Sequence, residues 1–307
     1  MRLSPRKGRG SATNGRLMRL ATYASISVAV TLILVKVVAY WMTGSVALLS
    51  SLVDSLLDAA ASLITLLAVR HSLTPADAEH RFGHGKVEAL AALMQAGLIT
   101  GSALFILFEA LPRLVDPQPL AAGEIGIAVM LFSIVTTFIL TRFQAHVVKR
   151  TGSTAIRADA LHYLSDLLTN AGVILALLLT TQLGFLRADP IIALIVAGYI
   201  FWSALRIGRH ALDVLMDREL SDEQRAQIIE VAKRHPSVLG VHELKTRQSG
   251  RNLFIQLHLE LEGSMNLYRA HAIADTVEAE LETRFPGAEV IIHQDPYILS
   301  EDIPVYR

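Results

Sequence analysis

The chain has 307 residues, and its 28 basic and 28 acidic side chains cancel, with histidine counted as neutral. Because a balanced charge gives no overall attraction to nucleic acid, we predict no nucleic-acid partner. Apolar residues make up 52% of the chain and charged residues only 18%, whereas a soluble domain is about a quarter charged. The chain has no cysteine, which excludes disulfides and thiolate metal sites and leaves nitrogen and oxygen as metal ligands.

Six apolar runs are long enough to cross a bilayer core of about 30 Å, which takes about 20 helical residues. They lie near residues 20–42, 45–69, 87–111, 123–146, 154–181 and 190–207. So many long apolar runs in one stretch of chain exceed what a soluble core can bury. We therefore predict an α-helical membrane protein with six transmembrane helices in a lipid bilayer.

The basic residues near the span ends predict the orientation, because cytoplasmic loops are enriched in lysine and arginine. The basic residues on one side of the membrane are Arg2, Arg6, Lys7, Arg9, Arg16, Arg19, Arg70, Arg81, Lys86, Arg142, Lys149, Arg150, Arg157, Arg206 and Arg209. The other side carries only Arg113 and Arg187. Both termini are therefore predicted to be cytoplasmic.

Beyond the sixth span the composition becomes that of a small soluble domain. We predict a helix over 221–235, strands over 238–247 and 252–262, a helix over 266–285 and a strand over 289–293. The order αββαβ predicts an α+β domain whose helices cover one face of a sheet. The predicted domains are a basic tail (1–19), a transmembrane domain (20–210), a cytoplasmic domain (211–297) and a C-terminal tail (298–307).

Four ionisable side chains lie within the second and fifth spans, where they are costly and so mark a function or a partner. Asp54 and Asp58 are four residues apart, as are His162 and Asp166, so each pair shares a helical face. At 1.5 Å per residue the first pair lies roughly 14–20 Å from the outer surface, and the second roughly 12–18 Å from the cytoplasmic one. In a core of about 30 Å both pairs reach the same depth, so we expect them to meet.

Three carboxylates and one imidazole can form the four-ligand tetrahedral shell that suits Zn²⁺. An empty and fully ionised cluster would be very costly in a low dielectric, so protons must bind when the metal leaves. Metal and protons then compete for one site, as a proton-coupled antiporter requires. The alternative interpretation is a hydrogen-bonded cluster that only holds helices together.

Three further charged residues of the spans are not predicted to bind metal. Lys36 either pairs with a carboxylate or extends to the membrane surface. Glu88 and Glu109 lie near span ends, where we expect water to solvate them.

Histidines outside the spans predict two more metal sites. Asp77, His80 and His84, in the connection between the second and third spans, offer three ligands within eight residues, although a solvated basic loop can contain histidine by chance.

In the soluble domain, His258 lies on the polar face of its strand, and His293 and Asp295 share a face of the last strand. With His242 and His271 on neighbouring elements, this set predicts metal binding rather than solvated surface histidines.

Together these motifs resemble the cation diffusion facilitator family, in particular its bacterial zinc and ferrous-iron efflux transporters. The resemblance covers about residues 20–297 and rests on the two intramembrane pairs, the histidine loop and the His-Gln-Asp-Pro segment at 293–296. It implies a homodimer in the cell inner membrane that exchanges cytoplasmic divalent metal for external protons. The metal it implies is zinc, with iron(II) or cadmium as alternatives.

The resemblance also implies residue roles. The residues of the implied transport site are Asp54, Asp58, His162 and Asp166. Those of the loop site are Asp77, His80 and His84. Those of a two-metal cytoplasmic site are His242, His258, His271, His293 and the bridging Asp295. Lys86 and Asp217 are implied to form a salt bridge between subunits.

Two other function classes remain open at this point. A membrane-bound metal sensor without transport would use the soluble domain but would give the intramembrane carboxylates no role. A membrane metallohydrolase would need an open metal position and a general base, as in the HExxH motif, which the sequence lacks. We therefore predict that the chain is not an enzyme.

Overall fold

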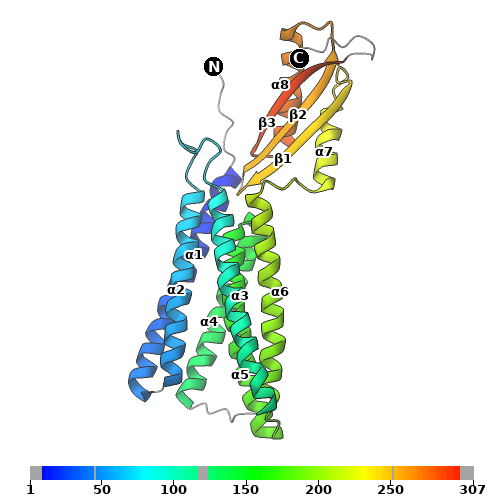
Figure 1. Cartoon of the computed structure of the whole chain (residues 1–307). Helices are drawn as coiled ribbons and strands as arrows, with labels where there is room; N and C mark the ends of the chain where they lie inside the picture. The colour runs from blue at the N-terminus through cyan, green and yellow to red at the C-terminus, as the bar shows by residue number, and fades with distance from the viewer. Residues whose placement is uncertain (1–8, 45, 117–123, 251, 298–307) are drawn as a thin grey trace. The chain divides into compact units, whose positions relative to one another are not determined.

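The computed structural model describes residues 9–44, 46–116, 124–250 and 252–297. These residues form eight helices and three strands (Figure 1). They divide into two compact units, one ending at Leu212 and the other beginning at Asp213. The first eight residues of the predicted basic tail, and the whole predicted C-terminal tail at 298–307, lie outside the described residues.

The first unit is built from long helices. They are α1 (Arg9–Thr43), α2 (Val46–Ser72), α3 (Lys86–Val115), α4 (Glu124–Thr151), α5 (Thr154–Leu183) and α6 (Ala188–Leu215). Within the described residues, six helices are long and apolar enough to cross a membrane, which confirms the predicted architecture. Large apolar side chains such as Trp41, Phe105 and Ile195 are 88%, 69% and 68% exposed, as expected for helices that contact lipid.

Helix α1 begins at Arg9 and therefore includes much of the segment predicted as a basic tail. The four residues directly before the predicted span, Arg-Leu-Met-Arg at 16–19, all have high helix propensity. Met18 and Ala21 are fully buried in an apolar cluster that also contains Val69 and Val147. This packing keeps the first helix continuous beyond the span that hydropathy alone marks.

The expectation that water solvates Glu88 is wrong. This residue lies at the start of α3, is only 2% exposed and accepts hydrogen bonds from the hydroxyls of Ser72 (2.9 Å) and Ser153. Hydroxyl donors from two neighbouring segments offset the cost of burying the carboxylate. Glu109 is exposed as expected and pairs with Arg113 at 2.6 Å.

The second unit has the predicted order of elements. They are α7 (Asp222–Ala232), β1 (Gly240–Ser249), β2 (Asn252–Glu262), α8 (Leu267–Arg284) and β3 (Ala288–Tyr297). The strands lie in the order β1-β2-β3, with β1 antiparallel and β3 parallel to the central β2.

The core of the second unit lies between the sheet and its two helices (Figure 1). Ile255, Leu257 and Leu259 of β2 are at most 1% exposed and pack with Ile228 of α7 and Val277 of α8. Because side chains alternate along a strand, the even-numbered residues of β2 point to the opposite face. This face carries the histidines described below.

Candidate metal centres

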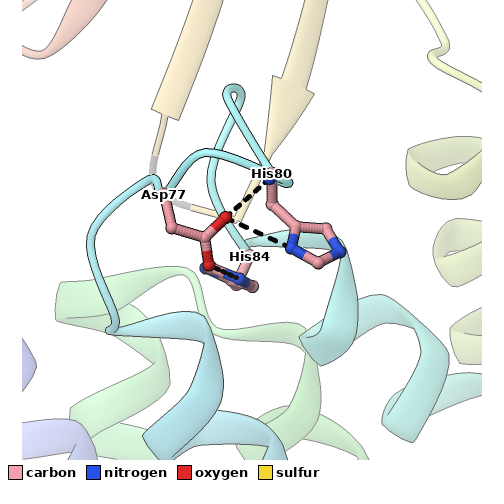
Figure 2. Close-up of side chains that lie close together, drawn as sticks. All are labelled: Asp77, His80 and His84. Carbon is pink, nitrogen blue, oxygen red and sulfur yellow. Dashed lines mark hydrogen bonds and ion pairs between the residues drawn. The ribbon is translucent and has the colours of Figure 1, made fainter.

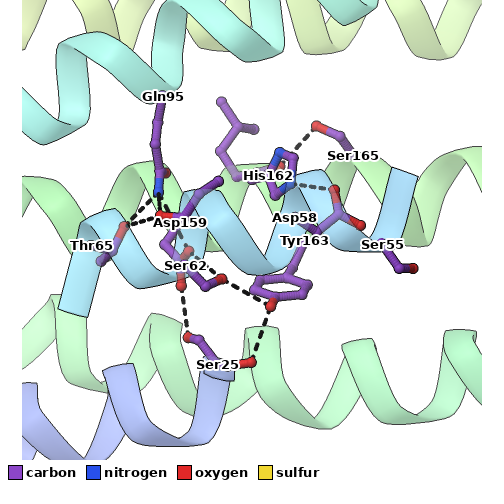
Figure 3. Close-up of polar contacts among 12 residues, drawn as sticks. Ser25, Ser55, Asp58, Ser62, Thr65, Gln95, Asp159, His162, Tyr163 and Ser165 are labelled. Atoms are coloured by element: carbon purple, nitrogen blue, oxygen red, sulfur yellow. Dashed lines mark hydrogen bonds and ion pairs between the residues drawn. The ribbon is translucent and has the colours of Figure 1, made fainter. Parts of the chain in front are cut away.

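The first cluster lies between α2 and α5. His162 Nε2 lies 2.8 Å from Asp58 Oδ1, and ligand atoms of Asp58, His162 and Asp166 all lie within 4.8 Å of one another. Figure 3 shows the His162 ring directed at the Asp58 carboxylate. All three residues are partly buried. Two carboxylates and an imidazole at this spacing suit a divalent metal that accepts nitrogen and oxygen ligands.

Asp54 stands outside this group of three, one helical turn earlier on α2, and is exposed. The structure thus gathers three of the four predicted ligands, and the role of Asp54 stays a prediction. Lys36 of α1 is 9% exposed, and its Nζ donates to the carbonyl of Ser51 (3.0 Å) and the hydroxyl of Ser55 (2.6 Å). Its charge also acts on the carboxylates of the cluster, so Lys36 is a buried part of their surroundings.

Sequence reasoning missed a further intramembrane carboxylate, Asp159, which is 1% exposed on α5. Its Oδ2 accepts hydrogen bonds from Ser25 of α1 and Gln144 of α4, both at 2.7 Å, and its Oδ1 accepts one from Ser62 of α2 at 3.1 Å. Figure 3 shows Asp159 with Ser25 and Ser62, near Asp58 and His162. With a longer hydrogen bond from the Gln95 side chain of α3 (3.5 Å), one carboxylate therefore joins five helices. The spacing of three residues to His162, which puts both on one helical face, was the available signal.

The second cluster occupies the connection between α2 and α3. The ligand atoms of Asp77, His80 and His84 lie within 4.8 Å of one another (Figure 2). The loop folds back at Gly83, which has φ of 80° and whose N–H donates to the carbonyl of His80 at 2.9 Å. Backbone hydrogen bonds from His80 and Glu79 to Oδ1 lower the pKa of Asp77 below its usual 3.8. An ionised carboxylate thus faces two imidazoles.

The hydrogen bonds of Thr74 place a proton on Nδ1 of His84. The Thr74 hydroxyl donates its only hydrogen to the carbonyl of His71 at 2.6 Å, so it accepts from His84 Nδ1 at 3.0 Å. The other nitrogen, His84 Nε2, lies 3.2 Å from Asp77 Oδ2 and has a lone pair in the neutral form of the ring. A cation at this point would satisfy both groups, and a fixed second nitrogen is typical of metal-binding histidines. The donor set of this loop therefore fits a metal ion.

The third cluster lies on the sheet face that the helices leave uncovered. His242, His258 and His293 stand in register across β1, β2 and β3, with successive ring centroids 5.2 Å and 4.7 Å apart. Asp295 lies two residues after His293 and therefore on the same face. The ligand atoms of His242, His258 and Asp295 lie within 4.8 Å of one another.

Asp295 contacts all three histidines of this row. Its Oδ2 lies 2.7 Å from His258 Nδ1 and 3.2 Å from His242 Nε2, and its Oδ1 lies 3.1 Å from His293 Nε2. Partial burial raises the pKa of Asp295, but the hydrogen bond with His258 and the charges of the three histidines outweigh it and hold that pKa below 3.8. A carboxylate whose two oxygens face different imidazoles has the geometry to bridge two metal ions.

A second residue missed by sequence reasoning, Glu260, supports this row. Its Oε1 lies 3.1 Å from His242 Nδ1, so both nitrogens of that ring face carboxylates. Its cross-strand partner is Gly240, where a Cβ atom would lie 2.1 Å from Glu260 Oε2. The glycine thus leaves the space that the glutamate occupies. The position of Glu260, two residues after His258 on the same strand face, was the available signal.

The remaining predicted residues lie elsewhere. His271 of α8 is exposed, with its Nε2 3.7 Å from Asp275 Oδ1, and the metal-binding groups found among the described residues do not include it. Asp217 pairs with Arg247 of the same unit at 3.4 Å, and Lys86 is the first residue of α3. The roles of His271, Lys86 and Asp217 stay predictions.

Comparisons with known proteins match both units of the chain. The family model described as the cation efflux transmembrane domain matches residues 22–216, and the model described as the cytoplasmic domain of cation efflux proteins matches residues 220–297.

Several similar bacterial proteins carry the name cation-efflux pump FieF. The one from Pectobacterium carotovorum is 53% identical over 281 residues, which cover 92% of this chain and 93% of the relative. The one from Klebsiella pneumoniae is 51% identical over 282 residues, covering 92% and 94%. The one from Yersinia pestis is 51% identical over 281 residues, which again cover 92% of this chain. With both units matched and similarity along nearly its whole length, the chain belongs to the cation efflux, or cation diffusion facilitator, family.

Proposed function

We propose that this chain exports divalent transition metal from the cytoplasm in exchange for protons, with zinc as the main substrate and iron(II) and cadmium as alternatives. The chain belongs to a family of membrane proteins that carry out metal cation efflux. The observation that carries the finer proposal is the group formed by Asp58, His162 and Asp166 between two membrane-spanning helices.

Proton coupling follows from the charge of this group. Ligand atoms of the two carboxylates and the imidazole lie within 4.8 Å of one another. When the site holds no cation and both carboxylates are ionised, the two negative charges repel each other strongly. A divalent cation removes this repulsion when the site is loaded with metal, and bound protons remove it when the metal has left. Because both occupants need the same oxygen and nitrogen atoms, loading one requires release of the other.

The choice of zinc follows from the ligand types. Imidazole suits zinc and iron, whereas magnesium and calcium prefer sites made wholly of oxygen. Asp54, one turn from Asp58, is the proposed fourth ligand, which would complete a tetrahedral shell.

We assign resident metal ions to the sites outside the membrane. His242, His258, His293 and Asp295, with His271, would hold two ions, and these ions would stabilise a homodimer formed through the cytoplasmic domain. Asp77, His80 and His84 would hold a further ion. Lys86 and Asp217 would pair between subunits. We propose the bacterial inner membrane as the location, with both termini in the cytoplasm, as the basic residues indicate.

The test uses purified full-length protein in liposomes that contain a zinc-sensitive dye. We expect zinc to enter those vesicles whose transporter exposes its cytoplasmic face to the outside, and to enter faster when the lumen is more acidic than the medium. Asp58→Asn should remove this uptake. Repeating the assay with iron(II), cadmium and manganese at two pH values ranks the substrates.

Three outcomes would contradict parts of the proposal. Zinc uptake that is independent of the pH gradient rules out proton exchange. Faster transport of manganese than of zinc rules out zinc as the main substrate. Metal binding without any transport favours a sensor that uses only its cytoplasmic sites.

A further inference from the structure

We propose that His71 is a fourth ligand of the loop site, where it joins Asp77, His80 and His84 to close the shell around one zinc-class ion. This inference rests on the proposed metal-binding role of that loop. It also assigns the loop a function, because a metal ion held in a closed four-ligand shell fixes the loop, as structural zinc sites do.

His71 lies in the last turn of α2, directly before the loop begins. Its ring is in contact with the ring of His84, with centroids 4.4 Å apart and planes at 66°. The ring of His80 also lies beside that of His84, at a centroid distance of 4.7 Å. Three imidazoles therefore lie together, and the ring that contacts the other two belongs to His84, which is only 6% exposed.

Thr74 places His71 and His84 relative to one another. Both the N–H and the hydroxyl of Thr74 donate to the carbonyl of His71, at 3.0 Å and 2.6 Å. The same hydroxyl accepts from His84 Nδ1. The backbone of His71 is thus fixed by the hydrogen bond that leaves His84 Nε2 available to a metal.

The ligand count requires one more donor. Asp77, His80 and His84 supply three ligand atoms within 4.8 Å, and structural zinc sites are almost always four-coordinate. His71 is outside this set of three, but its side chain is exposed and can rotate about its own torsions. Rotation that keeps the ring beside His84 would direct one of its nitrogens toward the ion without moving the backbone.

Coordination by His71 connects the loop to the helix that carries the membrane cluster. Asp58 precedes His71 on α2 by about 20 Å of helix at 1.5 Å per residue. A metal held by His71 and by the loop would fix the connection to α3 against the end of α2. The metal in the loop would therefore have a structural role: it holds the α2–α3 connection in place and is not itself transported.

The test uses the full-length chain with Asp58→Asn and Asp295→Asn, two substitutions that weaken the other metal centres. We expect this background to retain one zinc ion per chain during dialysis against a chelator. Adding His71→Phe, which keeps an aromatic ring but removes the nitrogen ligand, should speed zinc loss at least about tenfold, the low end of the loss that follows removal of a supporting partner from a metal site. X-ray absorption at the zinc edge should count three imidazoles in the background and two in this variant.

Two further variants make the outcome unambiguous. His146→Phe removes an exposed histidine of α4 and should change neither retention nor the imidazole count. Asp77→Ala should abolish retention. If Asp77→Ala abolishes retention and His71→Phe does not alter it, three ligands are sufficient and the role of His71 is rejected. If the background retains no zinc, the loop holds no resident metal and the inference fails, while zinc transport by the unmodified chain in liposomes still tests the proposed function separately.

Discussion

The imidazole of His162 lies 2.8 Å from the carboxylate of Asp58, although 104 positions of sequence separate them. The contact requires α2 and α5 to present their charged faces to each other at the same level. It also shields both groups in part, since their side chains are only 16% and 17% exposed. A pair of this kind, deep in an apolar bundle, is stable only with a proton or a cation to share.

Asp58→Asn tests this relationship, because it removes the negative charge and keeps nearly the same shape. We expect zinc uptake into liposomes to fall at least about tenfold, since even supporting partners of metal ligands contribute that much to affinity. The control is Asp116→Asn at the exposed end of α3, which changes the charge equally away from the cluster. Equal uptake by the two variants would remove Asp58 from the ion path.

Asp159→Asn should act on stability instead of metal affinity. An amide NH₂ in place of one carboxylate oxygen faces either Ser25 and Gln144 or Ser62, and the hydrogen bonds that remain lose the negative charge of their acceptor. Because hydrogen bonds to charged groups contribute about 1.5–3 kcal/mol each and neutral ones about 0.5–1.5 kcal/mol, we expect a loss of about 1–3 kcal/mol. Thermal unfolding in detergent, followed by circular dichroism, should shift to lower temperature while the zinc affinity of the folded protein changes little. A large loss of affinity without a shift in unfolding would instead make Asp159 part of the ion site.

The sequence predicts the transmembrane fold well because hydropathy and helix length are local properties. Each of the six spans lies largely within its helix, and the depth count brings Asp58 and His162 together. What the sequence leaves unresolved depends on packing between helices. Burial of Glu88 and the convergence of donors on Asp159 need the side chains of several helices, whose relative positions hydropathy does not determine.

For the cytoplasmic centre, strand alternation identifies the face of His258, His293 and Asp295. The alignment of His242 with that row depends on the register of β1, which an irregularity between His242 and Lys245 shifts. No periodicity in the sequence reveals this bulge. The support from Glu260 depends on the same register, because it requires Gly240 as the cross-strand neighbour.

Glu260→Gln tests the support that this side chain gives to His242. The change leaves the size of the side chain nearly the same but removes the charge that faces Nδ1. We expect zinc affinity at the cytoplasmic centre to fall by about 10–100-fold, the usual effect of losing an outer partner. Isothermal titration of the full-length protein measures it, with Glu262→Gln at the end of β2 as the matched control.

Gly240→Ala provides an independent test of the same contact. The new Cβ would occupy the position of Glu260 Oε2, so the glutamate must turn away from His242. We expect a loss of affinity similar to that of Glu260→Gln, and no additional loss when the two changes are combined. Losses that simply add would mean that the glycine acts on the site by another route.

The pH dependence of the metal-free cytoplasmic unit should reflect Asp295. The pKa of its carboxyl is below 3.8 in the folded protein, so the ionised form stabilises the fold. This contribution is complete above the pKa of an unfolded aspartate, about 3.9, and is lost as the pH falls through the lower folded value. Hydrogen exchange of the β2 amides, read by mass spectrometry on the full chain, measures it locally. Asp295→Asn should reduce the protection of the β2 amides near pH 6. At a pH well below 3.8 its protection should match that of the unmodified chain. The control Asp222→Asn, at the exposed start of α7, should reduce protection at neither pH. A reduction that is the same at every pH would mean that Asp295 acts through its shape and not through its charge.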